Sequence, residues 1–539
     1  MKFNTKTITV TLILILFLAG FFFRINLDGI DTTHPGNLKA ANAFYHVIAA
    51  DHIANSGEIF SNPYWDAEGH DDIINRVSQH EAITIAPLIK LTQAEAWNLS
   101  YLIVVLLSSL SIPLMYLLTK KLFKSEIMGI LSAALIVLPM ALDNWLYYMY
   151  IGIWLQSSVT PFLLLAMIFI IDILKKPKTW EILALSITIS AIFLLFPPVL
   201  IFIIPFLLII LWRLLKEKDI KKILYYITIP IISILIFGPI LLFGDAGIAA
   251  QDDKLIEIGT PNYQSAPFAK GLEVIPIILL AFGTYGLIQL LLNHKKYKKI
   301  LLSIFYLGGI FYILPFLMHG HVGYYLLRMK GGFLIYLAAP LIAYGIYHLI
   351  IKNMTRVSKN NTLKTSLTII IIIILIITAL PSFNGLKTAL NYEHISKEKY
   401  EVMLWVQENI PEREQMLILE GDYQLSGTYF KRTRFTLEQQ QLNEYFVGLS
   451  QGNDPNEIKG FWSGYPDWGK WSKRTGYFSF EKYEPLNKTQ KLTNFNYIYL
   501  EHLNQDIANM NQQIGNFLIQ QHNYETIYNE GAYTILKKQ

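Results

Sequence analysis

Eleven apolar runs, separated by short polar loops, constrain what this chain can fold into. Each run is long enough to cross a hydrocarbon core of about 30 Å as a helix. The runs occupy residues 8–23, 98–118, 126–142, 157–174, 181–196, 198–214, 223–243, 272–293, 300–318, 331–351 and 366–382. The 539 residues are 53% hydrophobic and only 16% charged. The sequence therefore predicts an α-helical polytopic membrane protein with about 11 transmembrane helices, because a single soluble domain is less apolar.

The basic residues predict the orientation of these helices. Lys and Arg gather in alternate loops, as the positive-inside rule requires if the N-terminus is cytoplasmic. These loops are 120–124, 175–178, 213–222, 295–299 and 352–364, whereas the loop 143–156 and the turn around Pro197 hold no Lys or Arg. An odd number of spans then places the C-terminus outside. We expect a multi-pass plasma membrane protein whose first run is an uncleaved anchor, since no small-residue cleavage site follows that run.

The predicted topology leaves three polar regions on the outer face. They are the first loop 24–97, the loop 244–271 and the tail after Pro381. We divide the chain into a transmembrane domain, 1–382, and an extracytoplasmic α/β domain, 383–539. In the tail, residues 396–410 have helical spacing between a Ser N-cap and Pro411. Segments 415–420 and 495–501 are strand-like, and 524–538 is typical of a hairpin that turns at 529–531.

Acidic side chains near the predicted outer face are candidates for chemistry, because charge near a membrane is costly. In the segment "NAFYHVIAADHIANSGE" at 42–58, His46 and Asp51 stand among apolar positions. A group of carboxylates can hold a hard cation such as Mg²⁺ or Mn²⁺. A solvated amphipathic loop is the simpler interpretation of any single residue there. Asp143 is the one acid of "ALDNWLYYMYIGIW" at 141–154, where an ordinary helix N-cap is the alternative.

Two basic residues stand at a predicted outer membrane edge. Arg328 and Lys330 precede a glycine pair in "LLRMKGGFLIYLAAP". A planar guanidinium there suits a phosphate or pyrophosphate group, and snorkelling to the interface is the alternative. The chain has no cysteine, which excludes thiolate metal sites and cysteine nucleophiles. The phosphate-binding loop, the dinucleotide fingerprint, the zinc-protease motif and the nucleophile elbow are also missing.

The order of these features resembles the GT-C membrane glycosyltransferases, and most closely the catalytic subunits of archaeal and bacterial oligosaccharyltransferases. "NAFYHVIAADHIANSGEI" is similar to the first-loop segment of that family, and "ALDNWLYYMYIG" to its acidic second-loop motif. "LLRMKGGFLIYLAAPLIAYG" is similar to the arginine-bearing span, and the stretch from "VMLWVQENIPEREQ" onward to the opening of the outer domain. Three departures stand out. Asn42 replaces the first-loop acid, Trp145 replaces the second acid of the second loop, and the acceptor motif lacks its tryptophan pair. Glu257 is the candidate for the catalytic-loop glutamate.

The resemblance implies a glycosyltransferase. It would move a sugar or oligosaccharide from a polyprenyl-phosphate or polyprenyl-diphosphate donor to a protein or glycan acceptor on the outer face. Asp31 and Asp143 would be catalytic and would hold a divalent cation, Mg or Mn, since many GT-C enzymes keep an acid just after the first span. Arg328 and Lys330 would bind the donor phosphate.

The supporting residues would be Asn42, His46 and Asp51, and the other partners would be membrane lipids, with no nucleic acid. Asn42 also supports an alternative, in which the chain is a catalytically inactive GT-C-like scaffold that binds glycan or assembles a cell-envelope complex. A transporter is a weaker interpretation, because no pair of Gly/Pro-broken spans repeats between the two halves.

Overall fold

The computed structural model describes the chain in many segments. The described residues are 5–28, 33–36, 47, 50–51, 53–55, 57, 79–137, 154–175, 177–195, 197–216, 220–243, 257–258, 274–310, 318–319, 333, 335–354, 361–389, 395–411, 414–419, 433–436, 445, 447–449, 451–452, 455–463, 488–502 and 505–539. The chain divides into two compact units. Unit 1 comprises Met1–Ile30, Tyr101–Ala246 and Asp253–Asn391, and unit 2 comprises Asp31–Ser100, Gly247–Asp252 and Tyr392–Gln539.

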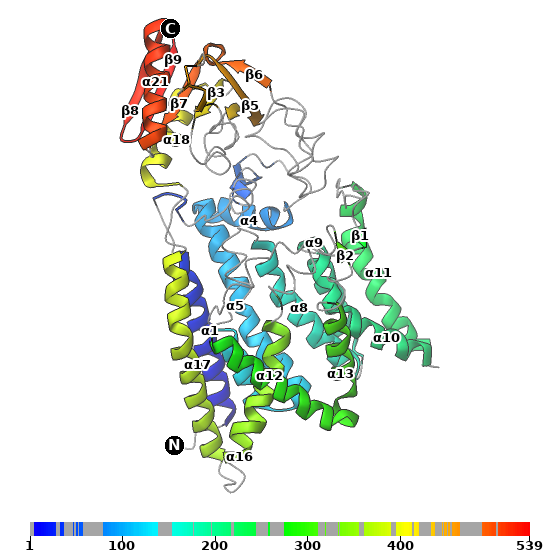
Figure 1. Cartoon of the computed structure of the whole chain (residues 1–539). Helices are drawn as coiled ribbons and strands as arrows, with labels where there is room; N and C mark the ends of the chain where they lie inside the picture. Colours follow the sequence, from blue (N-terminus) through cyan, green and yellow to red (C-terminus); the bar gives the residue numbers. More distant parts are fainter. Residues whose placement is uncertain are drawn as a thin grey trace. The chain divides into compact units, whose positions relative to one another are not determined.

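Unit 1 is built of apolar helices, coloured from blue to yellow-green in Figure 1. They are α1 (Thr5–Asp28), α5 (Ala96–Phe123), α6 (Glu126–Leu135), α8 (Trp154–Ile173), α9 (Thr179–Leu195), α10 (Ile204–Lys216), α11 (Ile220–Phe243), α12 (Val274–Leu292), α13 (His294–Gly308), a helix at Ile335–Met354 that ends in α16 (Lys352–Met354), and α17 (Asn361–Ala389). Every predicted apolar run overlaps one of these helices, so the predicted fold class is confirmed. Within the described residues, three helices are long and apolar enough to cross a membrane: Thr7–Asn26, Ala96–Phe123 and Ile335–Met354. The number of crossings stays a prediction.

The sixth predicted run, 198–214, differs from the expected single helix. It begins as a 3₁₀ helix at Pro197–Phe202 and continues as α10 after Ile203. Proline fixes φ and lacks an N–H, so Pro197 and Pro198 favour a new start, and Pro205 is tolerated only in the first turn of α10. With 13 residues, α10 is about 20 Å long, which is shorter than the hydrocarbon core.

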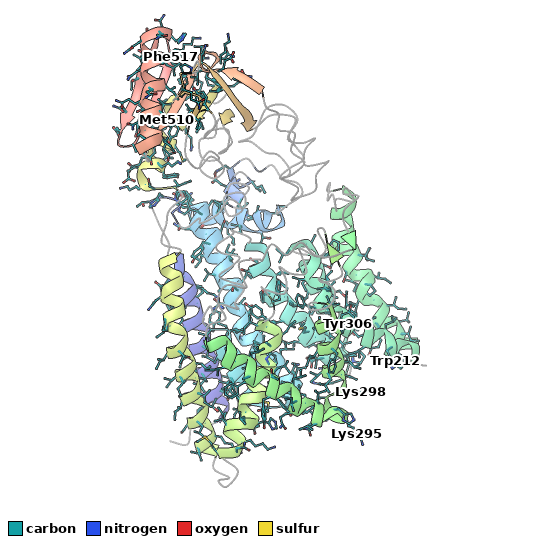
Figure 2. All side chains as sticks on the ribbon, in the orientation of Figure 1. Trp212, Lys295, Lys298, Tyr306, Met510 and Phe517 are labelled. Atoms are coloured by element: carbon teal, nitrogen blue, oxygen red, sulfur yellow. The ribbon has the colours of Figure 1, made fainter. Side chains whose placement is uncertain are left out.

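Contacts within unit 1 bring several predicted inner segments to one end of the helices. Lys121, after the second run, forms an ion pair with Asp172 at the end of α8. Thr9 near the start of α1 donates to Glu126 at 3.1 Å, and the rings of Phe123 and Tyr297 lie 5.9 Å apart. Figure 2 shows Lys295 and Lys298 on the exposed surface of α13 near Trp212 of α10. The predicted inner loops 120–124, 175–178 and 295–299 therefore share an end, and its assignment to the cytoplasm stays a prediction.

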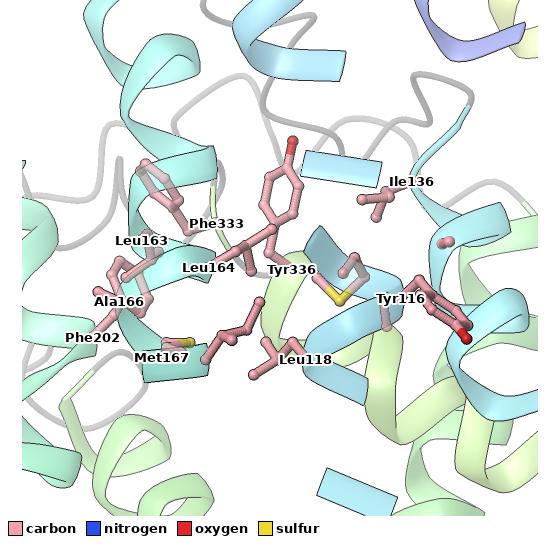
Figure 3. Close-up of a cluster of buried hydrophobic side chains, with 14 of the residues drawn as sticks. Tyr116, Leu118, Ile136, Leu163, Leu164, Ala166, Met167, Phe202, Phe333 and Tyr336 are labelled. Atoms are coloured by element: carbon pink, nitrogen blue, oxygen red, sulfur yellow. The ribbon is translucent and has the colours of Figure 1, made fainter. Parts of the chain in front are cut away.

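The core of unit 1 is a continuous cluster of buried aliphatic and aromatic side chains, part of which is drawn in Figure 3. Leu163 and Met167 of α8 lie there beside Phe202, whose ring is 5.3 Å from that of Phe333. Lipid tails are as apolar as these side chains, so close packing holds membrane helices together more than burial does.

Two glycines show how closely membrane helices approach in unit 1. A Cβ added to Gly345 would lie 2.0 Å from the carbonyl oxygen of Phe282 in α12. A Cβ added to Gly286 would lie 2.2 Å from the carbonyl oxygen of Leu341. The backbones of α12 and of the helix Ile335–Met354 are therefore in contact, which only glycine permits at both positions.

Unit 2 contains a seven-stranded sheet, drawn in yellow to red in Figure 1. The strands are β3 (Gln415–Leu419), β4 (Thr433–Thr436), β5 (Glu457–Ser463), β6 (Lys488–Lys491), β7 (Tyr497–Glu501), β8 (Tyr524–Glu530) and β9 (Tyr533–Lys538). Their order is β6-β5-β4-β3-β7-β9-β8, and β3 pairs parallel with both β4 and β7. The predicted strands and hairpin are present, and the turn includes Gly531, with φ of +57°. The small α/β domain expected in the tail is confirmed as a fold.

Helices cover both faces of this sheet. The predicted helix is α18 (Lys397–Asn409), where Ser396 accepts the N-cap hydrogen bond from the Lys399 N–H at 3.2 Å. A second helix, α21 (Gln505–His522), was not predicted. Its buried residues Ile514 and Leu518 share a core with Ile498 and Leu500 of β7. Met510 and Phe517 of the same helix, labelled in Figure 2, are partly buried and pack against this core. Because both faces are covered, β3 and β7 have continuous apolar sequences without alternation.

Candidate functional site

Most of the residues that the sequence predicts for the site lie outside the described residues. These are Asp31, Asn42, His46, Asp143, Arg328 and Lys330. Asp51 is described in full. Glu257 is described in its backbone, where the short strand β1 (Glu257–Ile258) pairs antiparallel with β2 (Met318–His319) in unit 1. The segment nine residues before Arg328 is thus joined to the candidate catalytic loop 244–271.

A buried arginine lies at the end of α1 in unit 1. The side chain of Arg24 is fully buried. Its Nη1 donates to the carbonyl oxygens of Gly20 at 3.1 Å and Val137 at 2.9 Å. Its Nη2 donates to the Ile136 carbonyl oxygen at 2.8 Å, and its Nε donates to Ser108 Oγ at 3.2 Å. We name this set of contacts the Arg24 node.

The Arg24 node joins three helices. Ile136 and Val137 directly follow α6, Ser108 belongs to α5, and the Tyr101 hydroxyl of α5 donates to the Arg24 carbonyl oxygen at 2.8 Å. The last carbonyls of a helix lack partners within the helix and carry the negative end of its dipole. A guanidinium satisfies them with hydrogen bonds and with charge. In the sequence, Arg24 is simply a basic residue at the end of an apolar run. The sequence therefore did not indicate that its side chain joins three helices by hydrogen bonds.

Unit 2 holds a polar cavity beside Asp51. The cavity has a volume of about 400 Å³ and is lined by Asp51, Ala54, Asn55, Ile89, Lys90, Gln93 and Ala94. The Asn55 amide donates to Asp51 Oδ1 at 3.0 Å. Lys90 lies in the last turn of α4 (Gln79–Thr92), and Gln93 directly follows this helix. The sequence did not indicate a helix at this place in the predicted first outer loop. One carboxylate, one ammonium group and two amides offer both donors and acceptors.

Two titratable groups adjoin this cavity in unit 2. Desolvation and then the charge of Asp51 raise the pKa of Glu95. Burial, Glu95 and Asp51 raise the pKa of Tyr400 to about 12. The Tyr400 ring meets Trp97 edge-on at 5.5 Å, so α18 packs against the first turn of α5 within unit 2. Tyr400 therefore keeps its hydroxyl proton, while the two neighbouring acids repel each other when both are ionised.

The described residues do not form a ready metal site. Among them, no group of three or more His, Asp or Glu side chains is placed to hold an ion. The expected ligands Asp31 and Asp143 lie outside this part of the chain, so the divalent cation stays a prediction, and we derive no chemical step through it.

Solved structures similar to this chain are membrane glycosyltransferases. ArnT from Cupriavidus metallidurans in the apo state has a TM-score of 0.52 and 11% identity, over 99% of this chain and 98% of ArnT. The oligosaccharyltransferase AglB from Archaeoglobus fulgidus, in complex with an inhibitory peptide and a dolichol-phosphate, has a TM-score of 0.50 and 11% identity, over 100% of this chain and 75% of AglB. An oligosaccharyltransferase from A. fulgidus in the apo form has a TM-score of 0.47 and 13% identity over 80% of this chain. The match covers 65% of the length of that oligosaccharyltransferase.

No protein-family model matches the sequence, and no curated protein matches it. The fold thus carries the likeness, since the identities are too low to indicate more. Both ArnT and AglB are GT-C superfamily membrane glycosyltransferases. The chain therefore shares its fold with these two structures, as the sequence motifs indicated, with helices followed by a C-terminal sheet domain.

Proposed function

We propose that the chain is a membrane glycosyltransferase that moves a sugar or oligosaccharide from a polyprenyl-phosphate or polyprenyl-diphosphate donor to an acceptor outside the cytoplasm. The observation that carries the proposal is the match of the whole chain to ArnT along nearly the full length of both proteins. A donor attached to a lipid fits an enzyme that acts on the outer face, where cytosolic nucleotide sugars are absent. The AglB structure contains a dolichol-phosphate, which is a lipid phosphate of this class.

The proposed roles follow the predicted residues. Asp31 or Asp143 acts as general base on an acceptor hydroxyl or amide, or orients a divalent cation. Arg328, assisted by Lys330, holds the donor phosphate through a charge-assisted hydrogen-bond fork. The cavity at Asp51 has the mixed donors and acceptors that bind sugar hydroxyls, so we assign it to the sugar-bearing side of the reaction, with Asn42 and His46 as supporting residues.

A transfer assay tests this function directly. The purified chain in lipid nanodiscs is incubated with a radiolabelled polyprenyl-phosphate sugar and with peptide and glycan acceptors, with and without EDTA. We expect label in an acceptor. Asp31→Asn and Asp143→Asn should each lower the rate about a hundredfold, a typical loss for an electrostatic contact in a transition state, while expression stays intact. Full activity of both variants in EDTA would remove the metal from the proposal.

The donor site has its own test. Arg328→Lys keeps the charge and loses the planar fork, so it should weaken donor binding, and Arg328→Ala should weaken it further. If snorkelling is the only role of Arg328, Lys substitutes freely. Wild-type donor binding by Arg328→Ala would exclude the phosphate site.

The second candidate function is an inactive GT-C-like scaffold, which Asn42 favours because it stands where the family has an acid. In that case the purified chain binds the lipid donor or a glycan, and no label reaches any acceptor. Restoring the acid with Asn42→Asp separates the two functions further. If the chain is a scaffold that lost activity through this position, Asn42→Asp should gain transfer activity. If the chain is an enzyme that uses Asp31, Asn42→Asp should change the transfer rate little.

A further inference from the structure

We propose that one face of α13 in unit 1 binds an anionic phospholipid, with its headgroup on two lysines and an acyl chain on the apolar side chains that follow. Residues three or four apart lie on the same side of a helix, so four exposed side chains form this face. We name them the α13 stripe: Lys295, Lys298, Leu302 and Phe305. None of these residues has a role in the proposed sugar transfer.

The start of α13 concentrates positive charge without a counter-charge of its own. The helix begins with "HKKYKK", its first turn holds no acid, and the N-cap residue Asn293 makes no side-chain cap hydrogen bond. Lys295 and Lys298 repel each other at this spacing, and both oppose the positive end of the helix dipole. In the described part of the chain, neither ammonium group has a carboxylate partner. An anion from outside the protein would therefore relieve a repulsion that the fold leaves in place.

Lysines at the end of α5, in the same unit, are treated differently. Lys120 forms an ion pair with Glu126 at 2.9 Å, and Lys121 forms one with Asp172. The protein thus supplies carboxylates to the end of α5, whereas it leaves the α13 stripe open to an external anion.

The second half of the α13 stripe favours a lipid over a soluble anion. Leu302 is 55% exposed and Phe305 is 58% exposed. Phe305 follows Lys295 by ten residues, which is about 15 Å along the helix and about half of a hydrocarbon core of about 30 Å. The stripe therefore has the length of one lipid leaflet, with charge at one end and apolar surface along the rest.

The neighbouring helix adds an aromatic residue at the charged end of the stripe. α10 packs against α13, and its Trp212 is 61% exposed near Lys298 (Figure 2). Tryptophan is enriched at the level of lipid headgroups, where its ring meets apolar chains and its N–H meets polar groups. Trp212 thus marks the same depth for the headgroup as the two lysines do.

Lipid binding by charge variants forms the first arm of the test. The full chain in a zwitterionic detergent is titrated with phosphatidylglycerol or phosphatidylcholine, and native mass spectrometry measures the dissociation constant of the first bound lipid. We expect phosphatidylglycerol to bind at least tenfold more tightly. Lys295→Gln with Lys298→Gln should weaken its binding about twenty-five-fold, since each basic residue at an anionic surface contributes about fivefold.

A charge-matched control separates this site from general attraction. Lys175→Gln with Lys352→Gln removes the same charge from exposed positions of unit 1 outside the α13 stripe. This pair should change the dissociation constant of phosphatidylglycerol less than threefold. An equal loss in the two pairs would mean attraction by net charge alone and would overturn the proposal.

The apolar half of the stripe distinguishes a lipid from a free phosphate. Leu302→Ser with Phe305→Ser keeps both lysines and removes exposed apolar surface, so it should weaken phosphatidylglycerol binding about tenfold. Inorganic phosphate, equimolar with the lipid, should displace little of it. Wild-type lipid binding in this variant, or full displacement by phosphate, would mean a site for a soluble anion and would refute the lipid.

Hydrogen exchange of residues 294–301 forms the last arm and needs neither a binding constant nor transferase activity. A bound headgroup stabilises the first turns of α13, so their exchange should be slower in nanodiscs of phosphatidylglycerol than in nanodiscs of phosphatidylcholine. The wild type and the control pair should both show this difference, and Lys295→Gln with Lys298→Gln should lose it. Equal exchange of the wild type in the two lipids overturns the proposal, whatever the transfer assay gives.

Discussion

Both units of the chain bury a basic side chain, and they stabilise it in different ways. In unit 1, Arg24 donates to backbone carbonyls and to a serine hydroxyl. In unit 2, Lys399 of α18 donates to Glu501 Oε2 of β7 at 3.1 Å, with both side chains less than 5% exposed. The sequence marks neither residue as buried, since Arg24 ends an apolar run and Lys399 stands in the charged stretch "SKEKYE".

The difference follows from what a helix end and a sheet centre offer. A helix end leaves carbonyl oxygens without partners inside the helix, so a cation placed there meets acceptors that already need a donor. The carbonyls of a central strand are used by both neighbouring strands, and β7 pairs with β3 and with β9. A cation above such a strand therefore needs a side-chain acceptor, and Glu501 supplies a carboxylate.

The largest expected effect comes from the ion pair in unit 2. Glu501→Gln or Lys399→Met alone leaves a buried charge without its counter-ion and should cost about 3–5 kcal/mol, whereas Lys399→Met with Glu501→Leu should recover most of that loss. Hydrogen exchange of the full chain in detergent, followed in residues 497–501, measures it. Additive losses in the double variant would show that the pair is not coupled and would break the contrast with Arg24.

The helix glycines should also differ between the units. Gly345→Ala forces a methyl group onto the Phe282 carbonyl oxygen and should destabilise unit 1 by about 1–3 kcal/mol, as overpacking does. Gly283→Ala is the matched control, because its methyl would meet only the Ile342 side chain, at 3.3 Å, and no backbone atom within 4 Å. In α21, the new methyl of Gly515→Ala would lie 3.4 Å from Leu500, so helix propensity should dominate and stabilise unit 2 by about 0.5–1 kcal/mol. Thermal unfolding in detergent with exchange readouts on both units compares the three, and a stabilising Gly345→Ala would contradict the close approach.

Removing a single hydrogen bond should give stability losses that differ less between the two units than those of the glycine variants. Ser396→Ala removes the N-cap of α18 and should cost about 1 kcal/mol. Thr119→Val removes the contact between α5 and α6 and should cost about 0.6 kcal/mol, the average for such bonds between membrane helices. Exchange protection in 397–409 and 126–135, respectively, reports each loss. A Thr119→Val loss well above that of Ser396→Ala would reverse the expected order.

The smallest effect concerns the acids beside the cavity. Glu95 has another acid, Asp51, nearby, and its pKa is raised by desolvation and by that charge. A folded-state pKa above the unfolded value means that the fold binds the proton more tightly. Stability from this group is then present at low pH and is lost as pH rises from the ordinary glutamate range through the raised pKa. Glu95→Gln should therefore raise the unfolding midpoint slightly at pH 7 and leave it unchanged at pH 4, as a paired pH series of thermal melts measures. A destabilised Glu95→Gln at pH 7 would reverse the sign.

The sequence by itself determined the apolar helices, because the length and periodicity of an apolar run are local properties. They decide whether a segment is more stable in lipid or in water without any contact to distant parts of the chain. It also determined Ser396 as a cap and the hairpin near Gly531, where turn chemistry is local too. Tertiary structure alone decided that Arg24 joins α1 to the end of α6, and that residues near the cavity come from α4 and from the 42–58 segment together. Spacing along the chain does not encode which helix ends meet, since that depends on packing between segments more than 100 residues apart, such as Arg24 and Val137.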